Sequence, residues 1–302
     1  MVAPYVTPPI LLAAPTGISW STIPIQGAAD TVRLAVQTDL CRRVTAEVDR
    51  ICHQPLRATI TTDVVTGPQG RRVRVMPDGT VRIVGTRWPV TQVIGARISP
   101  SSAFPRQWQA IPADQLRPER PLLDVYSGAS PGMSADGSSV ILLAPGWLTP
   151  GDTPQDIEVT YLAAWPHTTL TADAASGARA LLVDDITGWA GATGTAYGAA
   201  SHDTVTALTA TPVTAGMLSG PGTLGLAAPI GTTYPAGTLV SALPDTVMQA
   251  AIMLCVSQAL LRGATATSVQ TTASSRVKST GPSELDIANE AAAMLSSFRR
   301  VV

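Results

Sequence analysis

The side chains that could carry out acid–base or nucleophilic chemistry are few, and they are scattered along the chain. The three histidines, His53, His167 and His202, lie in separate sequence contexts. His202 precedes Asp203, and these two residues could form a catalytic triad with a distant serine. A loop histidine is the better interpretation, because the chain has neither a His-Glu-x-x-His pair nor a Gly-x-x-x-x-Gly-Lys loop. We therefore expect no enzymatic activity and no bound cofactor.

Neither the acidic residues nor the cysteines predict a metal site. The adjacent carboxylates Asp184 and Asp185 could bind a cation, but consecutive side chains of a strand or turn point to different sides. A solvated turn is therefore the better interpretation. Cys41, Cys52 and Cys255 form no Cys-x-x-Cys pair, and we expect them to be small buried hydrophobic residues in a reducing compartment.

One group of arginines predicts contact with an anion. Residues 77–79 read Pro-Asp-Gly, which favours a tight turn between two short strands. In the register that this turn sets, Arg74 lies opposite Arg82, with Arg72 beside them. Like charges in such positions destabilise a sheet by roughly 0.2–1 kcal/mol unless an anion neutralises them. Carboxylates of a neighbouring subunit and DNA phosphates are both candidates, and a solvated arginine face is the alternative.

The composition limits the class of protein to which the chain can belong. It has 302 residues, enough for two domains, and 45% of them are hydrophobic. Only 14% are charged, where about a quarter is usual, which favours a protein that associates with other subunits. The net charge of -1 argues against a protein that grips DNA. No apolar stretch is long enough for a transmembrane helix, so we expect no membrane partner.

The sequence pattern predicts an α+β protein: a helical connector core with β-hairpins and an inserted small all-β domain, barrel-like or sandwich-like. Residues 1–24, uncharged and rich in proline, are expected to form an extended arm along their own domain or a neighbour's. Residues 25–167 and 244–302 are expected to form the discontinuous core. Residues 168–243, rich in Thr, Ala and Gly with Gly and Pro turns, read as the inserted β domain.

Three helices are predicted within the expected core. The first runs from Asp30 to about His53 and carries an i, i+4 row of apolar residues. The second, residues 246–262, is apolar nearly all round and should lie at the centre of the core. The third begins after Ser283 and should bury Leu285 among others. The segments SSVILLA and DIEVTYLAAW, before the insert, are expected to form a pair of strands.

The order of these elements resembles a known family. The residues that carry the resemblance are the arm with Ile18 and Trp20, the segments PVTQVIGARIS and DIEVTYLAAWPH, the helix within LPDTVMQAAIMLCVSQALLRGATATSVQ, and the ending FRRVV. In this order they resemble the head-to-tail adaptor, or head-completion, proteins of long-tailed bacteriophages. The likeness covers most of the chain, although many members of that family lack a large insert.

The resemblance implies a role and a set of partners. Subunits of such adaptors form a ring with the twelve-fold symmetry of the portal protein and lie between the portal and the stopper or tail-terminator protein. Double-stranded DNA passes transiently through the ring. The chain would then belong to the neck of the virion and would be found in the host cytoplasm during assembly.

The end of the chain is a candidate portal contact. The segment Phe298, Arg299, Arg300, Val301 and Val302 suits a peptide that pairs with a partner, and the resemblance implies that such a tail reaches into the portal. Alternatively, Phe298 and Val301 close the core of their own subunit.

Two other function classes compete with the adaptor. A virion surface or carbohydrate-binding protein would use the inserted domain and would need exposed aromatic residues there, where the insert offers Trp189, Tyr197 and Tyr234. A hydrolase is the third class, and the scattered histidines argue against it.

Overall fold

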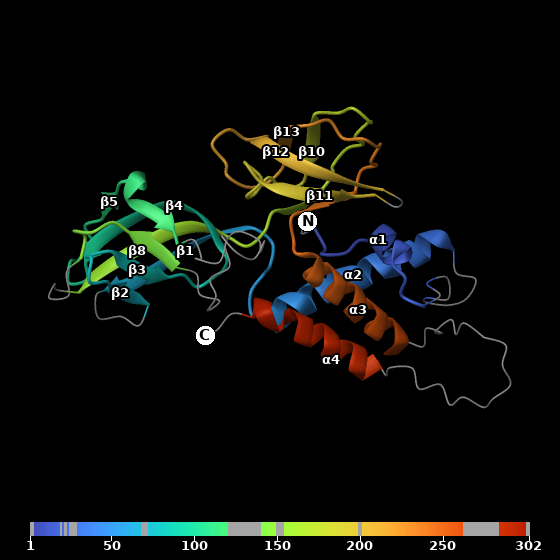
Figure 1. The fold of residues 1–302 in the computed structure, drawn as a ribbon, viewed down its shortest axis with the longest axis horizontal. Coiled ribbons are helices and arrows are strands. Elements are labelled where there is room, and N and C mark those ends of the chain that lie inside the picture. The colour runs from blue at the N-terminus through green and yellow to red at the C-terminus, as the bar shows by residue number, and fades with distance from the viewer. Residues whose placement is uncertain are drawn as a thin grey trace. The chain divides into compact units, whose positions relative to one another are not determined.

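The computed structural model describes residues 3–18, 20, 23, 29–67, 72–119, 140–148, 154–198, 201–261 and 284–299. The fold mixes helices with mostly antiparallel sheets (Figure 1). The chain divides into two compact units, which we call the helix–module unit (residues 1–53 and 167–299) and the sandwich unit (residues 54–166 and 300–302). The expected core of residues 25–167 and 244–302 therefore includes parts of both units.

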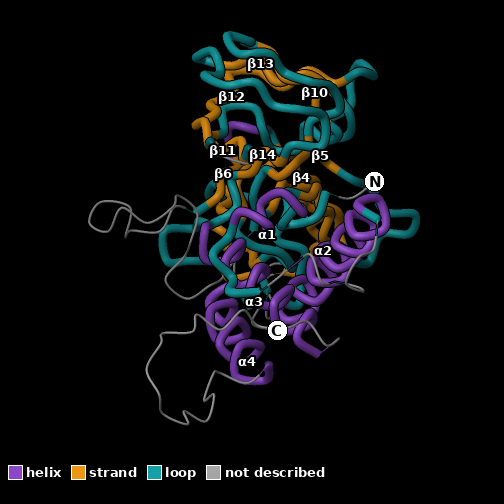
Figure 2. Tube along the Cα trace, turned by 90° about the vertical axis from the view of Figure 1, so that its right-hand side faces the viewer, coloured by secondary structure: helices purple, strands orange, loops and turns teal. Residues whose placement is uncertain are grey.

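Helices pack side by side in the helix–module unit (Figures 1 and 2), where α3 contacts both α2 and α4. Their bounds are Pro8–Ala13 for α1, Asp30–Cys52 for α2, Asp245–Leu261 for α3 and Glu284–Met294 for α4, which continues into a 3-10 turn at Leu295–Phe298. α3 buries most of its length, including Val247, Ala251, Leu254 and Cys255. Its predicted burial is confirmed, and its bounds differ by one residue at each end from the predicted range of residues 246–262.

The helix predicted from Asp30 is confirmed as α2. It ends at Cys52 and is capped by His53, which adopts a left-handed backbone (φ 55°) and donates its N–H to the carbonyls of Arg50 and Asp49. The C-terminal part of the apolar row is buried, whereas Val32 at its start is 49% exposed. In α4 the expected burial of Leu285 is wrong, because that side chain is 65% exposed. The buried positions of this helix and its 3-10 turn are Ala291, Leu295 and Phe298.

The N-terminal arm is not extended throughout. Pro8 and Pro9 occupy the first positions of α1, where a missing N–H costs nothing because no carbonyl precedes it in the helix. Tyr5 is fully buried; its N–H donates to Thr45 Oγ1 (2.9 Å) and its hydroxyl to Asp49 of α2. Its ring meets that of His167 edge-on. The arm therefore lies along its own unit.

Residues 167–241, most of the segment expected to be an inserted β domain, form a curled six-stranded sheet that we call the β module. Its strand order is β10-β13-β12-β11-β14-β9. The bounds are His167–Thr169 (β9), Ala180–Val183 (β10), Thr193–Tyr197 (β11), His202–Pro212 (β12), Gly222–Leu226 (β13) and Leu239–Ser241 (β14). The two edges meet at a bridge between Leu170 and Val183. The interior holds Leu181, Trp189, Val205, Leu224 and Val240 among its buried residues.

The two ends of the β module lie side by side. β9 pairs with β14, so that Thr168 faces Val240 and His167 faces Ser241. The segment therefore starts and ends at neighbouring positions of one sheet. The sequence did not signal β11, whose Gly194 and Ala196 lack strand propensity. A Cβ at Gly194 would lie 2.6 Å from the carbonyl oxygen of Ser241, so this strand requires glycine for its close approach to β14.

We expect the β module to be dispensable for folding of the helices. Replacing residues 170–238 with a short Gly/Ser linker should leave the far-UV helical signal and a cooperative unfolding transition, because β9 and β14 end side by side and the module has its own core. Circular dichroism during urea unfolding would measure this. Loss of the helical transition in the shortened chain would show that the module is part of the helical core.

The sandwich unit consists of two four-stranded antiparallel sheets, of order β1-β8-β4-β5 and β2-β3-β7-β6. The first has Thr59–Gly67 (β1), Gln155–Ala163 (β8), Val90–Pro100 (β4) and Gln109–Ile111 (β5); the second has Val73–Val75 (β2), Val81–Val84 (β3), Val140–Leu143 (β7) and Leu116–Pro118 (β6). One core includes Val65, Ile83, Ile141, Ile157 and Tyr161. The expected pairing of SSVILLA with DIEVTYLAAW is wrong: β7 and β8 belong to different sheets.

Candidate functional site

The predicted hairpin is present in the sandwich unit. Gly79 has φ 81°, Met76 donates its N–H to the carbonyl of Thr80 (2.8 Å), and Arg74 lies directly opposite Arg82. Val73, Val81 and Ile83 are buried on the other face. The turn chemistry and register expected from Pro-Asp-Gly are therefore confirmed.

Carboxylates of the same unit neutralise two of the three arginines. Arg82 pairs with Glu119, which follows β6, and Arg72 pairs with Asp63 on β1 at 2.6 Å. Arg74 is exposed, and in the part of the chain that the structure describes it makes no ion pair. Of the candidate anion-facing residues, Arg74 is thus the one most available to a phosphate or to a carboxylate of a neighbour.

The two arginines on this face should respond differently to neutralisation. Arg74→Gln is expected to leave the free energy of unfolding unchanged or a few tenths of a kcal/mol higher, because it removes a like-charge neighbour. Arg82→Gln should lower it by about 0.2–1 kcal/mol, because it breaks the pair with Glu119. Urea unfolding of both variants measures this difference. Equal losses would contradict the assignment of Arg74 as uncompensated.

Asp63 is the centre of a buried polar network that the sequence did not signal. The carboxylate is 7% exposed and accepts hydrogen bonds from the N–H of Thr86 (2.7 Å), the Thr86 hydroxyl (2.7 Å), the Tyr161 hydroxyl (2.9 Å) and Arg72 (2.6 Å). Burial alone would raise the pKa of Asp63, but these hydrogen bonds outweigh it and hold the pKa below its ordinary value. The network joins β1 to β8 and to the segments beside β2 and β3, which is a structural role.

The C-terminal candidate residues divide between the core and the surface. Phe298 is 5% exposed and lies in the 3-10 turn that packs against α2. Its burial corresponds to the second interpretation, in which this side chain completes the core of its own unit. Arg299 is exposed. Arg300, Val301 and Val302 lie outside the described residues.

The histidines and cysteines do not assemble into a catalytic site. His53 and His202 are exposed, whereas His167 is buried between the carbonyl of Pro4 (3.0 Å) and the Ser241 hydroxyl (2.8 Å). The three cysteines are free and buried, as expected. Burial raises the pKa of the Cys52 thiol to about 12, which makes it a poor nucleophile.

The carboxylates of the β module hold turns together. Asp203 accepts from the backbone N–H groups of Gly231 (2.8 Å) and Thr232 (3.1 Å), and Asp185 accepts from those of Thr187 (2.9 Å) and Gly220 (3.0 Å). Asp203 is therefore committed to a loop and not to the ring of His202. Among the described residues no group of side chains is arranged to hold a metal ion.

The chain also has one Gly-x-Ser-x-Gly stretch, residues 128–132, which lies outside the described residues.

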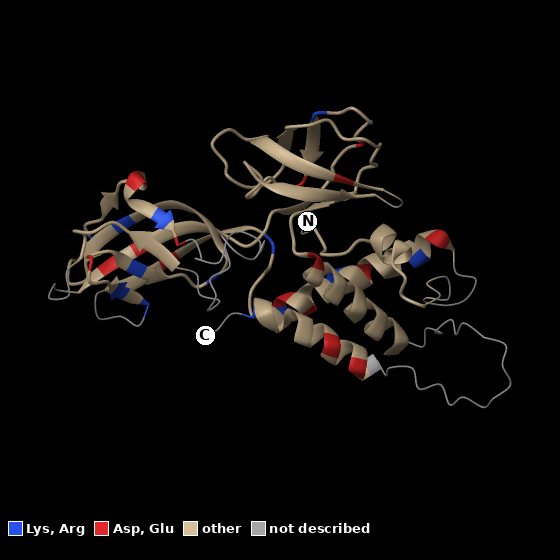
Figure 3. Ribbon diagram, in the orientation of Figure 1, with Lys and Arg blue, Asp and Glu red and all other residues tan. Residues whose placement is uncertain are grey.

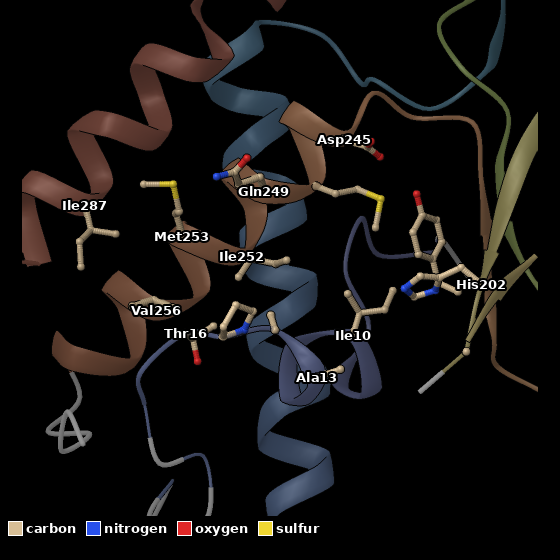
Figure 4. Close-up of a pocket in the computed structure, with 15 residues that line it drawn as sticks. Ile10, Ala13, Thr16, His202, Asp245, Gln249, Ile252, Met253, Val256 and Ile287 are labelled. Carbon is tan, nitrogen blue, oxygen red and sulfur yellow. The ribbon is translucent and has the colours of Figure 1, made fainter. Parts of the chain in front are cut away.

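A pocket of about 620 Å³ lies in the helix–module unit (Figure 4). Its walls are mostly apolar side chains of α1 and α3, such as Ile10, Ile252 and Met253. Tyr197, His202 and Asp245 form a polar end, with the rings of Tyr197 and His202 5.3 Å apart. Burial, the charge of Asp245 and a hydrogen bond to it raise the pKa of Tyr197. The walls come from distant parts of the sequence, so no local pattern could predict this pocket.

Comparisons with known protein families, curated proteins and solved structures gave no significant match. None of the described helices combines the length and the apolar character needed to cross a membrane.

Proposed function

We propose that this chain is a structural virion protein: a head-to-tail adaptor whose copies form a ring beneath the portal of a long-tailed bacteriophage. The ring would connect the capsid to the stopper or tail terminator and let the genome pass. The observation that supports this most is the distribution of side chains at the surface. Charged side chains such as Arg72 and Arg82 pair with carboxylates of their own unit, whereas several large apolar side chains are exposed to solvent. That surface suits a subunit that is completed by its neighbours.

The hairpin between β12 and β13 is the clearest example. Four apolar side chains on it are exposed, namely Leu208 (64%), Val213 (78%), Met217 (52%) and Leu218 (58%). Figure 3 shows that the β module carries few charged residues, and the sequence has none from Thr204 to Pro244. An apolar hairpin without charges around it would favour contact with a protein partner in the neck.

The pairing of arginines with carboxylates also suits a channel through which DNA moves without being bound tightly. A protein that binds duplex DNA stably needs many uncompensated cations, whereas Arg72 and Arg82 are each paired with a carboxylate. Arg74 would remain as a single weak contact with a DNA phosphate. Such a surface would let DNA slide past.

The alternative, a carbohydrate-binding or surface-binding virion protein, receives less support. Sugar binding commonly uses exposed aromatic faces, but Trp189 and Tyr234 of the β module are 0% and 1% exposed. Tyr197 is partly buried at the polar end of the pocket. These three residues therefore do not form an aromatic platform on the module's surface.

Negative-stain imaging of the purified protein, alone and mixed with a portal protein, tests the proposal. A ring that docks coaxially on the portal is the expected result. Failure to bind the portal over a wide concentration range, with the chain folded by circular dichroism, would reject the adaptor role. Binding to cell-surface glycans without portal docking would favour the alternative.

A further inference from the structure

The sandwich unit has one long edge strand. Three of its four edge strands, β2, β5 and β6, span three residues each, whereas β1 spans nine. Within the described part of the chain, β1 forms ladder hydrogen bonds with β8 alone. Alternate N–H and carbonyl groups along an edge strand point away from its partner. As far as the described residues go, β1 therefore presents a row of unpaired backbone donors and acceptors.

Three devices that often protect such an edge are missing from β1. Natural edge strands carry lysine, proline or a bulge that prevents a further strand from pairing. The sequence of β1, TITTDVVTG, has no proline and no basic residue, and its pairing with β8 runs without interruption from Thr59 to Gly67. Its one charge, Asp63, points inward, a position in which a charge can protect an edge. Here four hydrogen bonds of the network described above hold this carboxylate away from the open side of the strand. The bulges of this sheet lie in β4 instead.

The side chains beside this edge are also suited to contact. Ile60 and Val64 point outward and are 37% and 48% exposed. On the outward face, the register places Val64, Glu158, Arg97 and Ala110 in one row across the four strands. Arg97 and Glu158 form a two-fold hydrogen-bonded pair in the middle (2.8 and 2.9 Å). The charges are thus paired in the centre, and both ends of the row are apolar.

The two edges of this sheet are compatible in direction. All neighbours in the order β1-β8-β4-β5 are antiparallel, so β5 runs opposite to β1. A second copy placed beside the first in the same orientation can therefore pair its β5 antiparallel with the open edge of β1. Such a head-to-tail contact uses two different surfaces and generates rings when its rotation closes.

We propose that β1 is a docking edge for a second copy of this chain, which adds its β5 strand so that the sheets of neighbouring subunits become continuous. The inference rests on the proposed function in one respect, namely that identical subunits form a closed ring. The occupant is a second copy because one sheet supplies both complementary edges.

Cysteine cross-linking tests the pairing directly. Val64→Cys and Ala110→Cys place thiols at the outer ends of the row, and the three native cysteines are buried. With oxidised glutathione as the oxidant, the double variant should give a ladder of disulfide-linked dimers, trimers and larger species, and each single variant should remain unlinked. A dimer from Val64→Cys alone would indicate two-fold β1–β1 pairing and overturn the proposal. Absence of a ladder from the double variant would also overturn it.

Edge protection gives an independent test. Ile60→Lys with Val64→Lys adds the charges that edge strands usually carry, and Leu182→Lys, on the β module and 50% exposed, is the matched control. In sedimentation velocity the double variant should lose self-association while the control assembles like the wild type. Hydrogen exchange should show that the β1 amides that point away from β8 are protected in the wild-type assembly alone. Assembly by the double variant, or a wild type that stays monomeric, would overturn the proposal.

The outcomes separate this inference from the adaptor role. A chain that forms the ladder but does not bind the portal keeps the docking edge and rejects the adaptor. A chain that docks on the portal but forms no ladder keeps the adaptor role and rejects the docking edge. Protection of β1 amides that requires added portal protein would assign the edge to the portal and overturn the second-copy proposal.

Discussion

Leu254→Asp is expected to abolish folding of the helical part of the chain. Leu254 lies on α3, which packs against α2 and α4, and its side chain is 5% exposed. A carboxylate there would have no partner and would lose its hydration, at a cost of several kcal/mol. Most domains are stable by only about 5–15 kcal/mol, so we expect insoluble protein or loss of the far-UV helical signal.

Leu261→Asp is the matched control on the same helix. Leu261 is 67% exposed, and a surface substitution of this kind usually changes stability by less than about 0.5 kcal/mol. Expression, solubility and urea unfolding of the two variants provide the comparison. Soluble Leu254→Asp protein with a cooperative helical transition like that of Leu261→Asp would show that α3 is not central to the core.

Asp63→Ala should destabilise the sandwich unit by about 3 kcal/mol. The substitution leaves the Thr86 N–H, the Tyr161 hydroxyl and the guanidinium of Arg72 without their common acceptor in a buried site. Asp114→Ala, in the same unit at an exposed position, is the control and should change little. Urea unfolding followed by tryptophan fluorescence would report both. Equal stability of the two variants would remove the assigned role of Asp63.

A fall in pH should destabilise the protein through the hydrogen-bond network around Asp63. The folded-state pKa of Asp63 is lowered, so its contribution to stability is complete above the unfolded-state pKa of about 3.9 and is lost as the pH falls through the folded value. The wild type should therefore lose more stability than Asp63→Asn between neutral pH and about pH 3. Parallel pH profiles of the two proteins would contradict this assignment.

Local chemistry made some elements predictable. The hairpin follows from Pro-Asp-Gly, because a turn fixes its own register, and α3 follows from a nearly continuous apolar run. The β module was recognisable from its composition. The start of α1 was missed because Pro8 and Pro9 read as helix breakers, although the first helical turn tolerates both.

Long-range contacts explain what the sequence could not reveal. Asp63 and Tyr161 meet only because β1 pairs with β8, and Glu119 reaches Arg82 only because β6 and β3 both pair with β7. No local pattern encodes such meetings. We therefore expected the anion beside the arginines to come from a neighbouring subunit or from DNA, whereas the fold itself supplies Asp63 and Glu119 for two of them.

The division of the chain sets an order of events during synthesis. Residues 54–166 form a contiguous stretch, so the sandwich unit can fold as soon as that stretch has left the ribosome. The ring contact of Tyr5, by contrast, can form only after His167 has been made. The packing of α2 against α3 can form only after α3, which is made about two hundred residues later. For most of its synthesis the translating chain therefore exposes the apolar row of α2 that α3 later covers, and chaperones that bind exposed apolar side chains should act on that row.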